Sequence, residues 1–287
     1  MRDGGREARW WTRDGNRIVC ELCPHRCRIA EGQAGRCGVR QNQNGTLISL
    51  TDGRYLTGHL DPIEKKPLAR FRPGTWIYSV GTAGCNLSCD FCQNWELVHM
   101  PLDRPGTRFL SDDYILAEAA REPSIGIAFT YNEPLMNYEN LLRLSQSAKA
   151  RGLETVVVTN GYLNPEPMQE LCPFIDAWNI DLKGIRDDYY RRLCGGHVAP
   201  VLESIRLADA TGHVEVTCLL IEGENTADDD IRDLALAVAA INRSIPLHLS
   251  RYFPAHLRKD PPTPLPTMFR AREICAKILE YVYLGNV

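Results

Sequence analysis

The chain has 287 residues, 44% of them hydrophobic and 24% charged, and its formal net charge is -3. This length can bury the core of one barrel-sized domain with a small appendage. The sequence has no apolar run near the roughly 18 residues that a membrane-spanning helix needs, and Met1–Arg6 lacks the apolar core of a secretion signal. We therefore expect a soluble cytoplasmic protein with no membrane partner. The small net charge gives no general basis for binding nucleic acid.

The first part of the chain differs from the rest. Residues 1–70 hold many glycine, asparagine and charged residues and only short apolar runs, such as Leu47–Leu50. We interpret them as a small Cys-rich N-terminal module, followed by a second domain over residues 71–287. The stretch Pro67–Gly74, which ends in the turn dipeptide Pro73-Gly74, is the expected junction.

This module contains four closely spaced cysteines, Cys20, Cys23, Cys27 and Cys37. A reducing compartment keeps thiols free of disulfides, so the group indicates metal ligands. Four thiolates close a tetrahedral zinc site, and small glycine-rich modules often need a structural metal, which makes zinc the first interpretation. A second 4Fe-4S cluster that relays electrons is the alternative. Free thiols and substrate-binding thiols are the remaining alternatives. They apply if docking on the barrel, rather than a metal, stabilises the module.

From about residue 75, short apolar runs alternate with amphipathic stretches. This alternation predicts parallel strands joined by helices. Six strands are expected, the number of a partial parallel (β/α)6 barrel of the α/β class, at residues 76–80, 125–129, 154–159, 177–181, 214–221 and 247–251.

Three helix starts are marked by a capping side chain followed by acidic residues, which the helix dipole favours. The capping residues are Ser111, Asn137 and Thr226. Along residues 226–242, one apolar face is expected to pack into the core, with Ile231, Leu234, Ala235 and Val238. The isolated Cys172, Cys194, Cys218 and Cys275 are expected to be buried as small hydrophobic side chains.

Three further cysteines, Cys85, Cys89 and Cys92, directly follow the first predicted strand. A four-iron cluster normally takes four cysteines, so three leave one iron with an open coordination position. Such a site indicates catalysis more than electron storage. Zinc with a distant fourth ligand is the alternative.

Polar residues follow the next three strands as well. They form the segments Thr130–Pro134, Thr159–Gly161 and Asp181–Lys183. Because functional loops of a parallel barrel follow the carboxyl ends of its strands, we expect these loops to meet at one rim. Asp181 and Lys183 alternate along a strand and therefore point the same way. A salt bridge between them, and a turn at Asn160-Gly161, are the structural alternatives.

The cysteine spacing, with the aromatic Phe91 before Cys92, resembles the signature of the radical S-adenosylmethionine (SAM) superfamily. Within it, the chain is similar to the AmmeMemoRadiSam system radical SAM enzymes, relatives of the pyruvate formate-lyase activating enzymes. The similarity runs from about Val19 to Val287 and is carried by four segments, Asp61–Leu68, Cys92–Trp95, Tyr131–Pro134 and Tyr283–Val287.

The resemblance implies cofactors and roles for individual residues. Cys85, Cys89 and Cys92 would hold a 4Fe-4S cluster whose open iron binds the amino and carboxylate groups of SAM. Asn132 and Glu133 stand where the superfamily's Gly-Gly-Glu motif contacts the amino group. The other implied cofactor-binding residues are Asp181 and Lys183 for the ribose and carboxylate, Thr159 and Asn160 for positioning, and Phe91 against the adenine or packed under the loop.

The implied reaction is reductive SAM cleavage to a 5'-deoxyadenosyl radical, which abstracts hydrogen from a small-molecule or partner-bound substrate. An activase that generates a glycyl radical on a partner protein is the alternative. A non-catalytic metal-binding interaction or nucleic-acid module is the alternative of another class. The resemblance implies a flavodoxin or ferredoxin as reductant and Memo-like or AMMECR-type proteins as partners. The substrate is not named, and Arg54, His248, Arg251 and Tyr252 are candidates either for its cavity or for a satisfied polar rim.

Overall fold

The computed structural model describes residues 5–102 and 107–287. Within them, one sheet has eight strands in the order β16-β15-β14-β13-β12-β11-β9-β8. The strands β9 to β16 of this sheet are parallel, whereas β8 is antiparallel to β9. Their bounds are β8 Thr57–Pro62, β9 Trp76–Gly81, β11 Ser124–Phe129, β12 Glu154–Thr159, β13 Ala177–Asp181, β14 His213–Leu220, β15 Leu247–Arg251 and β16 Val282–Gly285. The predicted α/β partial barrel is confirmed.

All six predicted strands form, and each end lies within one residue of its predicted position. The structure adds β8 and β16 at the two edges of the sheet. β8 contains Pro62 and exposes His59 and Leu60, whereas β16 is apolar in sequence but only four residues long and half-buried.

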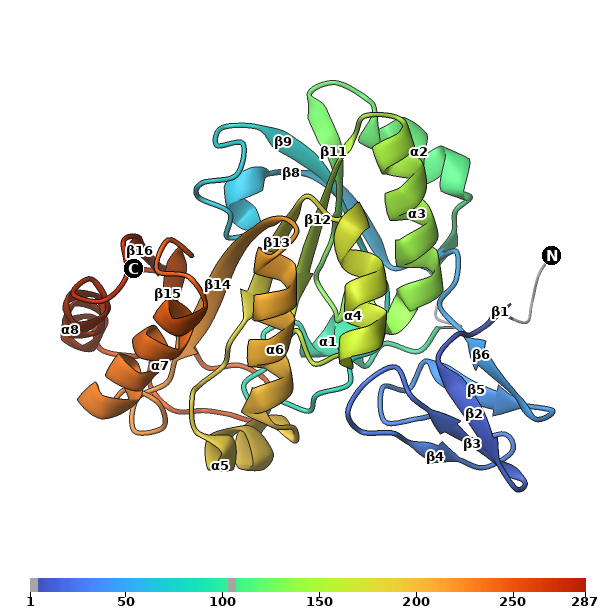
Figure 1. The fold of residues 1–287 in the computed structure, drawn as a ribbon, viewed down its shortest axis with the longest axis horizontal. Coiled ribbons are helices and arrows are strands. Elements are labelled where there is room, and N and C mark those ends of the chain that lie inside the picture. The colour runs from blue at the N-terminus through green and yellow to red at the C-terminus, as the bar shows by residue number, and fades with distance from the viewer. Residues whose placement is uncertain (1–4, 103–106) are drawn as a thin grey trace.

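Helices alternate with the strands, and α3, α4 and α6 lie across one side of the sheet in Figure 1. Cys172, Cys194, Cys218 and Cys275 are buried, as predicted.

None of the described helices is long and apolar enough to cross a membrane. The helices are α1 Trp95–Val98, α2 Asp112–Ala119, α3 Tyr138–Ala150, α4 Pro165–Leu171, α5 Asp187–Tyr189, α6 Val198–Asp209, α7 Asp228–Ile241 and α8 Leu265–Cys275, with single turns at Ile63–Lys65, Pro134–Asn137, Cys172–Phe174 and Tyr190–Cys194.

Of the three predicted caps, Ser111 is confirmed because its side chain accepts a hydrogen bond from the Tyr114 amide. The predictions for the other two side chains are wrong. Asn137 precedes α3 but donates to Asn140 Oδ1, and Thr226 accepts from the Gly223 amide within the preceding turn. The apolar face predicted for α7 is confirmed as core.

The N-terminal region forms small antiparallel sheets beside the barrel (Figure 1). Its hydrophobic residues, including Ile18, Leu22 and Leu47, belong to the same buried cluster as the barrel core. The strands are β1 Arg6–Glu7, β2 Trp11–Asp14, β3 Arg17–Cys20, β4 Arg28–Ile29, β5 Arg40–Gln43, β6 Thr46–Ser49 and β7 Arg54–Tyr55, the last paired with β10 Arg108–Phe109. Since β8 extends the main sheet, the division near residue 70 stays a prediction.

Residues 61–72, which we call the strap, close the inner side of the sheet at the amino ends of its strands. Leu68 packs with side chains of β9, β11, β12 and β13. Asn179 on β13 donates to the Pro67 carbonyl over 2.9 Å. Next to it in register, Glu215 on β14 accepts from the Ala69 and Arg70 amides over 2.9 and 2.7 Å. The strap therefore connects the edge strand β8 to the middle of the sheet.

The carboxylate of Glu215 also accepts from His213 and His248, over 2.9 and 2.5 Å. Burial alone would raise its pKa, but these four hydrogen bonds lower the pKa to about 2. Because the pKa is lower in the folded chain than its usual 4.5, the ionised form stabilises the fold above about pH 4.5.

Replacing Glu215 with Gln should lower the free energy of unfolding by about 3 kcal/mol, since it leaves buried donors unpaired. The difference from wild type should shrink as pH falls below about 4.5 towards 2, where Glu215 takes up a proton. Chemical unfolding at several pH values measures both effects. Glu203→Gln, which removes a surface pair with Arg206 on α6, is the matched control and should cost less than about 1 kcal/mol. Equal losses in the two variants would contradict the role of Glu215.

Candidate functional site

A cavity of about 450 Å³ opens where the loops after β9, β11, β12 and β13 meet. Parallel strands bring their carboxyl ends to one edge, and this places residues distant in sequence around a common space. The cavity is lined by Cys85, Cys89 and Cys92 and by every residue predicted to bind the cofactor, namely Phe91, Asn132, Glu133, Thr159, Asn160, Asp181 and Lys183. The structure thus brings the predicted site residues together, and their individual roles stay predictions.

The cysteine loop is held by the backbone on both sides. The Ser88 amide donates to the Cys194 carbonyl over 2.9 Å, and the Gly84 amide donates to the Val98 carbonyl over 3.0 Å. Gly84 has a φ of +89°, which favours glycine, and a Cβ there would lie 2.7 Å from the Val39 side chain. The loop therefore fits closely between the barrel and the N-terminal module.

The three thiols fit an iron-sulfur cluster by their donor chemistry. Burial raises the pKa of Cys85 well above that of a free thiol, so binding iron would have to displace its proton. The Leu87 amide and the Asn160 side-chain amide donate to Cys85 Sγ over 3.4 and 3.5 Å, and such hydrogen bonds tune the potential of a cluster. Among the described residues, no three His, Cys, Asp or Glu side chains gather around one point as ligands of a single ion.

Glu133 lies at the centre of the hydrogen bonds between loops. Oε1 accepts from Thr159 Oγ1 over 2.6 Å and from the Leu135 amide over 3.1 Å, while Oε2 accepts from the Asn160 amide over 2.8 Å. Burial raises the pKa of Glu133 to about 7 despite these hydrogen bonds. The carboxyl group therefore stands near the midpoint of its titration at neutral pH.

The side chain of Asn132 holds the cysteine loop. Oδ1 accepts from the Thr82 amide over 3.0 Å, and Nδ2 lies within 3.0 to 3.2 Å of the Ala83, Gly84 and Glu133 carbonyls. Its contacts connect the end of β9 to the loop after β11. We interpret Asn132 as a residue that positions the loop, a role that the cysteine spacing does not reveal.

Asp181 and Lys183 point the same way, as their alternation predicts, and form a salt bridge of 2.8 Å. Burial would lower the pKa of Lys183, but the charges of Asp181 and Cys89 raise it, so the ammonium group stays protonated. The predicted salt bridge thus exists, and both residues still line the cavity.

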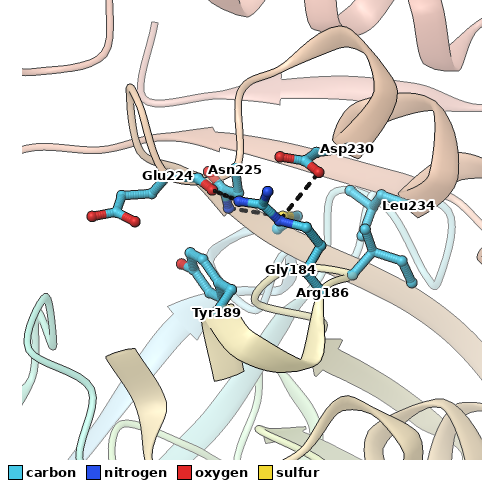
Figure 2. Close-up of a pocket in the computed structure, with 9 residues that line it drawn as sticks. Gly184, Arg186, Tyr189, Glu224, Asn225, Asp230 and Leu234 are labelled. Atoms are coloured by element: carbon cyan, nitrogen blue, oxygen red, sulfur yellow. Dashed lines mark hydrogen bonds and ion pairs between the residues drawn. The ribbon is translucent and has the colours of Figure 1, made fainter. Parts of the chain in front are cut away.

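The loop after Lys183 is fixed from behind by a second set of contacts (Figure 2). Asn225 Nδ2 donates to the Lys183 carbonyl over 3.0 Å. Figure 2 shows the Arg186 guanidinium between Asp230 and the segment that carries Glu224, and Arg186 donates to the Glu224 carbonyl over 3.0 Å. Arg186, Glu224, Asn225 and Asp230 line a small pocket next to this loop, and among them Asn225 contacts Lys183 directly.

Phe91 is buried beneath the cysteine loop, with its ring centroid 6.4 Å from that of Tyr189. This contact supports the packing alternative, although Phe91 also lines the cavity. The opposite side of the cavity was predicted from the sequence only at Tyr131, which belongs to the predicted rim segment Thr130–Pro134. It consists of Lys65, Lys66 and Pro67 from the strap, with Tyr131, Thr217, Ser250 and Asn286.

Tyr131 and the strap are joined through one carboxylate. Asp61 accepts from Lys65, Lys66 and the Tyr131 hydroxyl over 2.9, 2.7 and 2.5 Å. Tyr131 has a φ of +73°, a strained backbone for a bulky residue that often marks a functional site. The sequence signalled this part of the cavity through three segments that carry the resemblance, Asp61–Leu68, Tyr131–Pro134 and Tyr283–Val287.

The four substrate candidates do not line the described cavity. His248 binds Glu215, Arg251 donates to the Thr263 carbonyl over 2.7 Å, and the buried Tyr252 donates to the Arg258 carbonyl. Arg54 lies in β7. His248, Arg251 and Tyr252 thus follow the polar-rim alternative, whereas the neighbouring Ser250 on β15 lines the cavity.

Comparison with known proteins decides the family. The model of the radical SAM superfamily matches residues 79–235, which include the three cysteines and all seven predicted cofactor residues. The chain belongs to the radical SAM superfamily. An uncharacterized protein of Methanocaldococcus jannaschii is 39% identical over 98% of this chain and 85% of its own length. The superfamily's enzymes depend on a 4Fe-4S cluster and SAM, which the donor set here fits.

Relatives with named activities are more distant. The GTP 3',8-cyclase of Geobacter sulfurreducens is 31% identical over 61% of this chain, which spans 54% of that enzyme. The pyruvate formate-lyase-activating enzyme of Clostridium pasteurianum is 23% identical over 61% of this chain and 75% of its own. A radical SAM methyltransferase from Sphaerobacter thermophilus shares the fold, with a TM-score of 0.52, 19% identity and coverage of 74% and 70% of the two chains.

The titration of Glu133 should appear in SAM binding by the reconstituted protein. Above about pH 7 the carboxylate is ionised and would attract the amino group of SAM if it binds there, whereas below about pH 7 it takes up a proton. Affinity should therefore fall about tenfold between pH 8 and pH 6. Anaerobic calorimetric titration measures it, and Glu133→Gln should flatten this dependence. The same pH profile in wild type and variant would exclude Glu133 as the group responsible.

Proposed function

We propose that this protein is a radical SAM enzyme that abstracts hydrogen from a small-molecule or partner-bound substrate. The observation that carries the proposal is the sharing of one cavity by the three-cysteine loop, Glu133 and the Asp181-Lys183 pair. When bound, the cluster and SAM supply a one-electron reduction of the sulfonium and a 5'-deoxyadenosyl radical that takes a hydrogen atom.

The chain's own residues would bind and orient the cofactor. Cys85, Cys89 and Cys92 would hold the cluster. The Glu133 carboxylate would accept from the amino group of SAM through Oε2, which has a single donor at present and keeps a free lone pair. Asp181 offers acceptors for ribose hydroxyls, and Lys183 offers a cation for the SAM carboxylate.

The substrate would enter on the side of the strap. Thr217, Ser250 and Asn286 present small polar groups there, and Lys65 and Lys66 contribute cations beside Asp61. This wall suits a small polar molecule or one residue of a bound partner. The side chains from the strap would also limit access of water to the reacting atoms.

Within the superfamily, we propose that the chain is an AmmeMemoRadiSam system enzyme. It is supported by the strap and the C-terminal Asn286, since both come from segments that carry the resemblance and both line the cavity. This assignment implies Memo-like or AMMECR-type proteins as partners, a flavodoxin or ferredoxin as reductant, and a cytoplasmic location.

A glycyl-radical activase is the second candidate, favoured by the similarity to an activating enzyme. The two are distinguished by where the hydrogen originates. An activase would leave a glycyl radical, visible by paramagnetic resonance, on a partner protein, whereas the preferred function would move deuterium from a labelled small molecule into 5'-deoxyadenosine.

Replacing Cys89 with Ala should abolish SAM cleavage, because two thiolates cannot hold the cluster. After anaerobic reconstitution and dithionite reduction, the variant should release no 5'-deoxyadenosine and should lose about four irons per chain. Cys172→Ala, at a buried cysteine outside the cavity, is the matched control and should keep both. Cleavage that survives in Cys89→Ala would refute the proposed reaction.

Replacing Lys183 with Met should weaken SAM binding by about tenfold or more, since the SAM carboxylate would lose its cation. Lys149→Met removes a lysine of a surface pair with Asp176 and should bind SAM normally. Anaerobic titration compares the two variants. Unchanged affinity in both would favour the non-catalytic alternative, in which Lys183 only pairs with Asp181.

A further inference from the structure

The four cysteines of the N-terminal region surround a second, small cavity. Cys20 ends β3, Cys23 and Cys27 lie in the turn after it, and Cys37 precedes β5. The cavity wall consists of these four cysteines with Leu22, Gly35, Arg36, Arg40, Asn86 and Met136. The Cys20 amide donates to the Cys27 carbonyl over 3.0 Å, and the Arg36 amide donates to Cys27 Sγ over 3.4 Å. The fold therefore gathers four thiols that are spread over 18 positions of the sequence.

One buried donor in this wall lacks a partner. Arg40 is 1% exposed, and its terminal nitrogens bind Glu139 and the Arg9 carbonyl. Its Nε has no hydrogen-bond partner among the described residues. A buried unpaired donor is costly, and sulfur atoms of an anionic ligand would satisfy it. Arg40 thus points to a ligand that carries negative charge and acceptor atoms.

The two cysteine sites are separated by a single residue. Asn86 lines the N-terminal cavity, whereas its covalent neighbour Cys85 lines the SAM cavity. Asn160 Nδ2 contacts both, at 2.9 Å from Asn86 Oδ1 and 3.5 Å from Cys85 Sγ. A Cβ on Gly84 would lie 2.9 Å from the Cys37 carbonyl. A group held by the four cysteines would therefore lie against Asn86, which is the covalent neighbour of Cys85 and shares the hydrogen-bonding partner Asn160 with it.

A structural zinc ion would also satisfy Arg40 through its thiolate ligands, but it makes no use of the adjacency of the two cysteine sites. The module has its own buried side chains, with Ile18, Leu22 and Leu47 at most 1% exposed, and they continue into the barrel core. It is thus anchored without a metal, and zinc has no redox chemistry to deliver to the neighbouring site. A second iron-sulfur cluster would use both the adjacency and the free donor of Arg40.

We propose that Cys20, Cys23, Cys27 and Cys37 hold a second 4Fe-4S cluster that passes electrons to the cluster at Cys85, Cys89 and Cys92. A reduced flavodoxin- or ferredoxin-type protein gives up one electron, and the second cluster goes from the 2+ to the 1+ state. It returns to 2+ when the same electron reduces the first cluster. The relay rests on the proposed function, whereas the presence of the second cluster does not.

The first test measures metal in a variant that leaves the N-terminal region intact, Cys85→Ser/Cys89→Ser/Cys92→Ser. After anaerobic reconstitution it should keep about four irons and four sulfides per chain, and wild type about eight of each. Dithionite should produce a paramagnetic signal that SAM does not alter. Zinc in place of iron, or no bound metal, would overturn the second cluster whatever the protein's reaction.

The second test follows electron flow in the wild-type protein, so it needs no variant to fold. Reduced flavodoxin is mixed with the oxidised protein and samples are frozen at increasing times. A paramagnetic signal that SAM does not alter should appear first and decay as the SAM-sensitive signal of the first cluster grows. Direct reduction of the first cluster, with the second signal later or absent, would overturn the relay.

Discussion

The buried carboxylate of Glu133 is the constraint on which the rest of the site depends. It fixes the loop after β11 to the end of β12 through Thr159 and the Asn160 amide. Asn160 in turn contacts Cys85 Sγ, so one network connects the acid to the cysteine that we propose as a cluster ligand. Burial keeps this group near its titration midpoint, where modest changes in local charge alter its protonation. The protein thereby couples the geometry of three loops to a single ionisable group.

The strap covers the inner side of the sheet, which a partial barrel leaves open. Glu215 binds the strap amides with its ionised carboxylate, and Asp61 binds two lysines and Tyr131. Both carboxylates are largely removed from water, where unpaired charges would be costly. The strap can therefore support one wall of the cavity only because these acids are fully paired.

The N-terminal region is more than an appendage to the barrel. Its Arg40 forms a buried pair with Glu139 of α3, and its backbone at Cys37 approaches Gly84 of the cysteine loop. This packing places Asn86 in the wall of the four-cysteine cavity and its covalent neighbour Cys85 in the wall of the larger cavity at the carboxyl ends of the strands. The electron path that we propose follows from this shared wall, which neither cysteine motif indicates on its own.

The sequence by itself determined the strands, because buried parallel strands are continuous apolar runs, and the cysteine loop, because ligand spacing is local. It also placed Asp181 and Lys183 on one face, since alternation is a local property. The edge strand β8 lacks such a pattern and the apolar run of β16 is short, so both strands emerged only from pairing with their neighbours. The loop-positioning contacts of Asn132, the pairing of Glu215 and the adjacency of the cysteine sites join residues distant in sequence, so only the tertiary structure decided them.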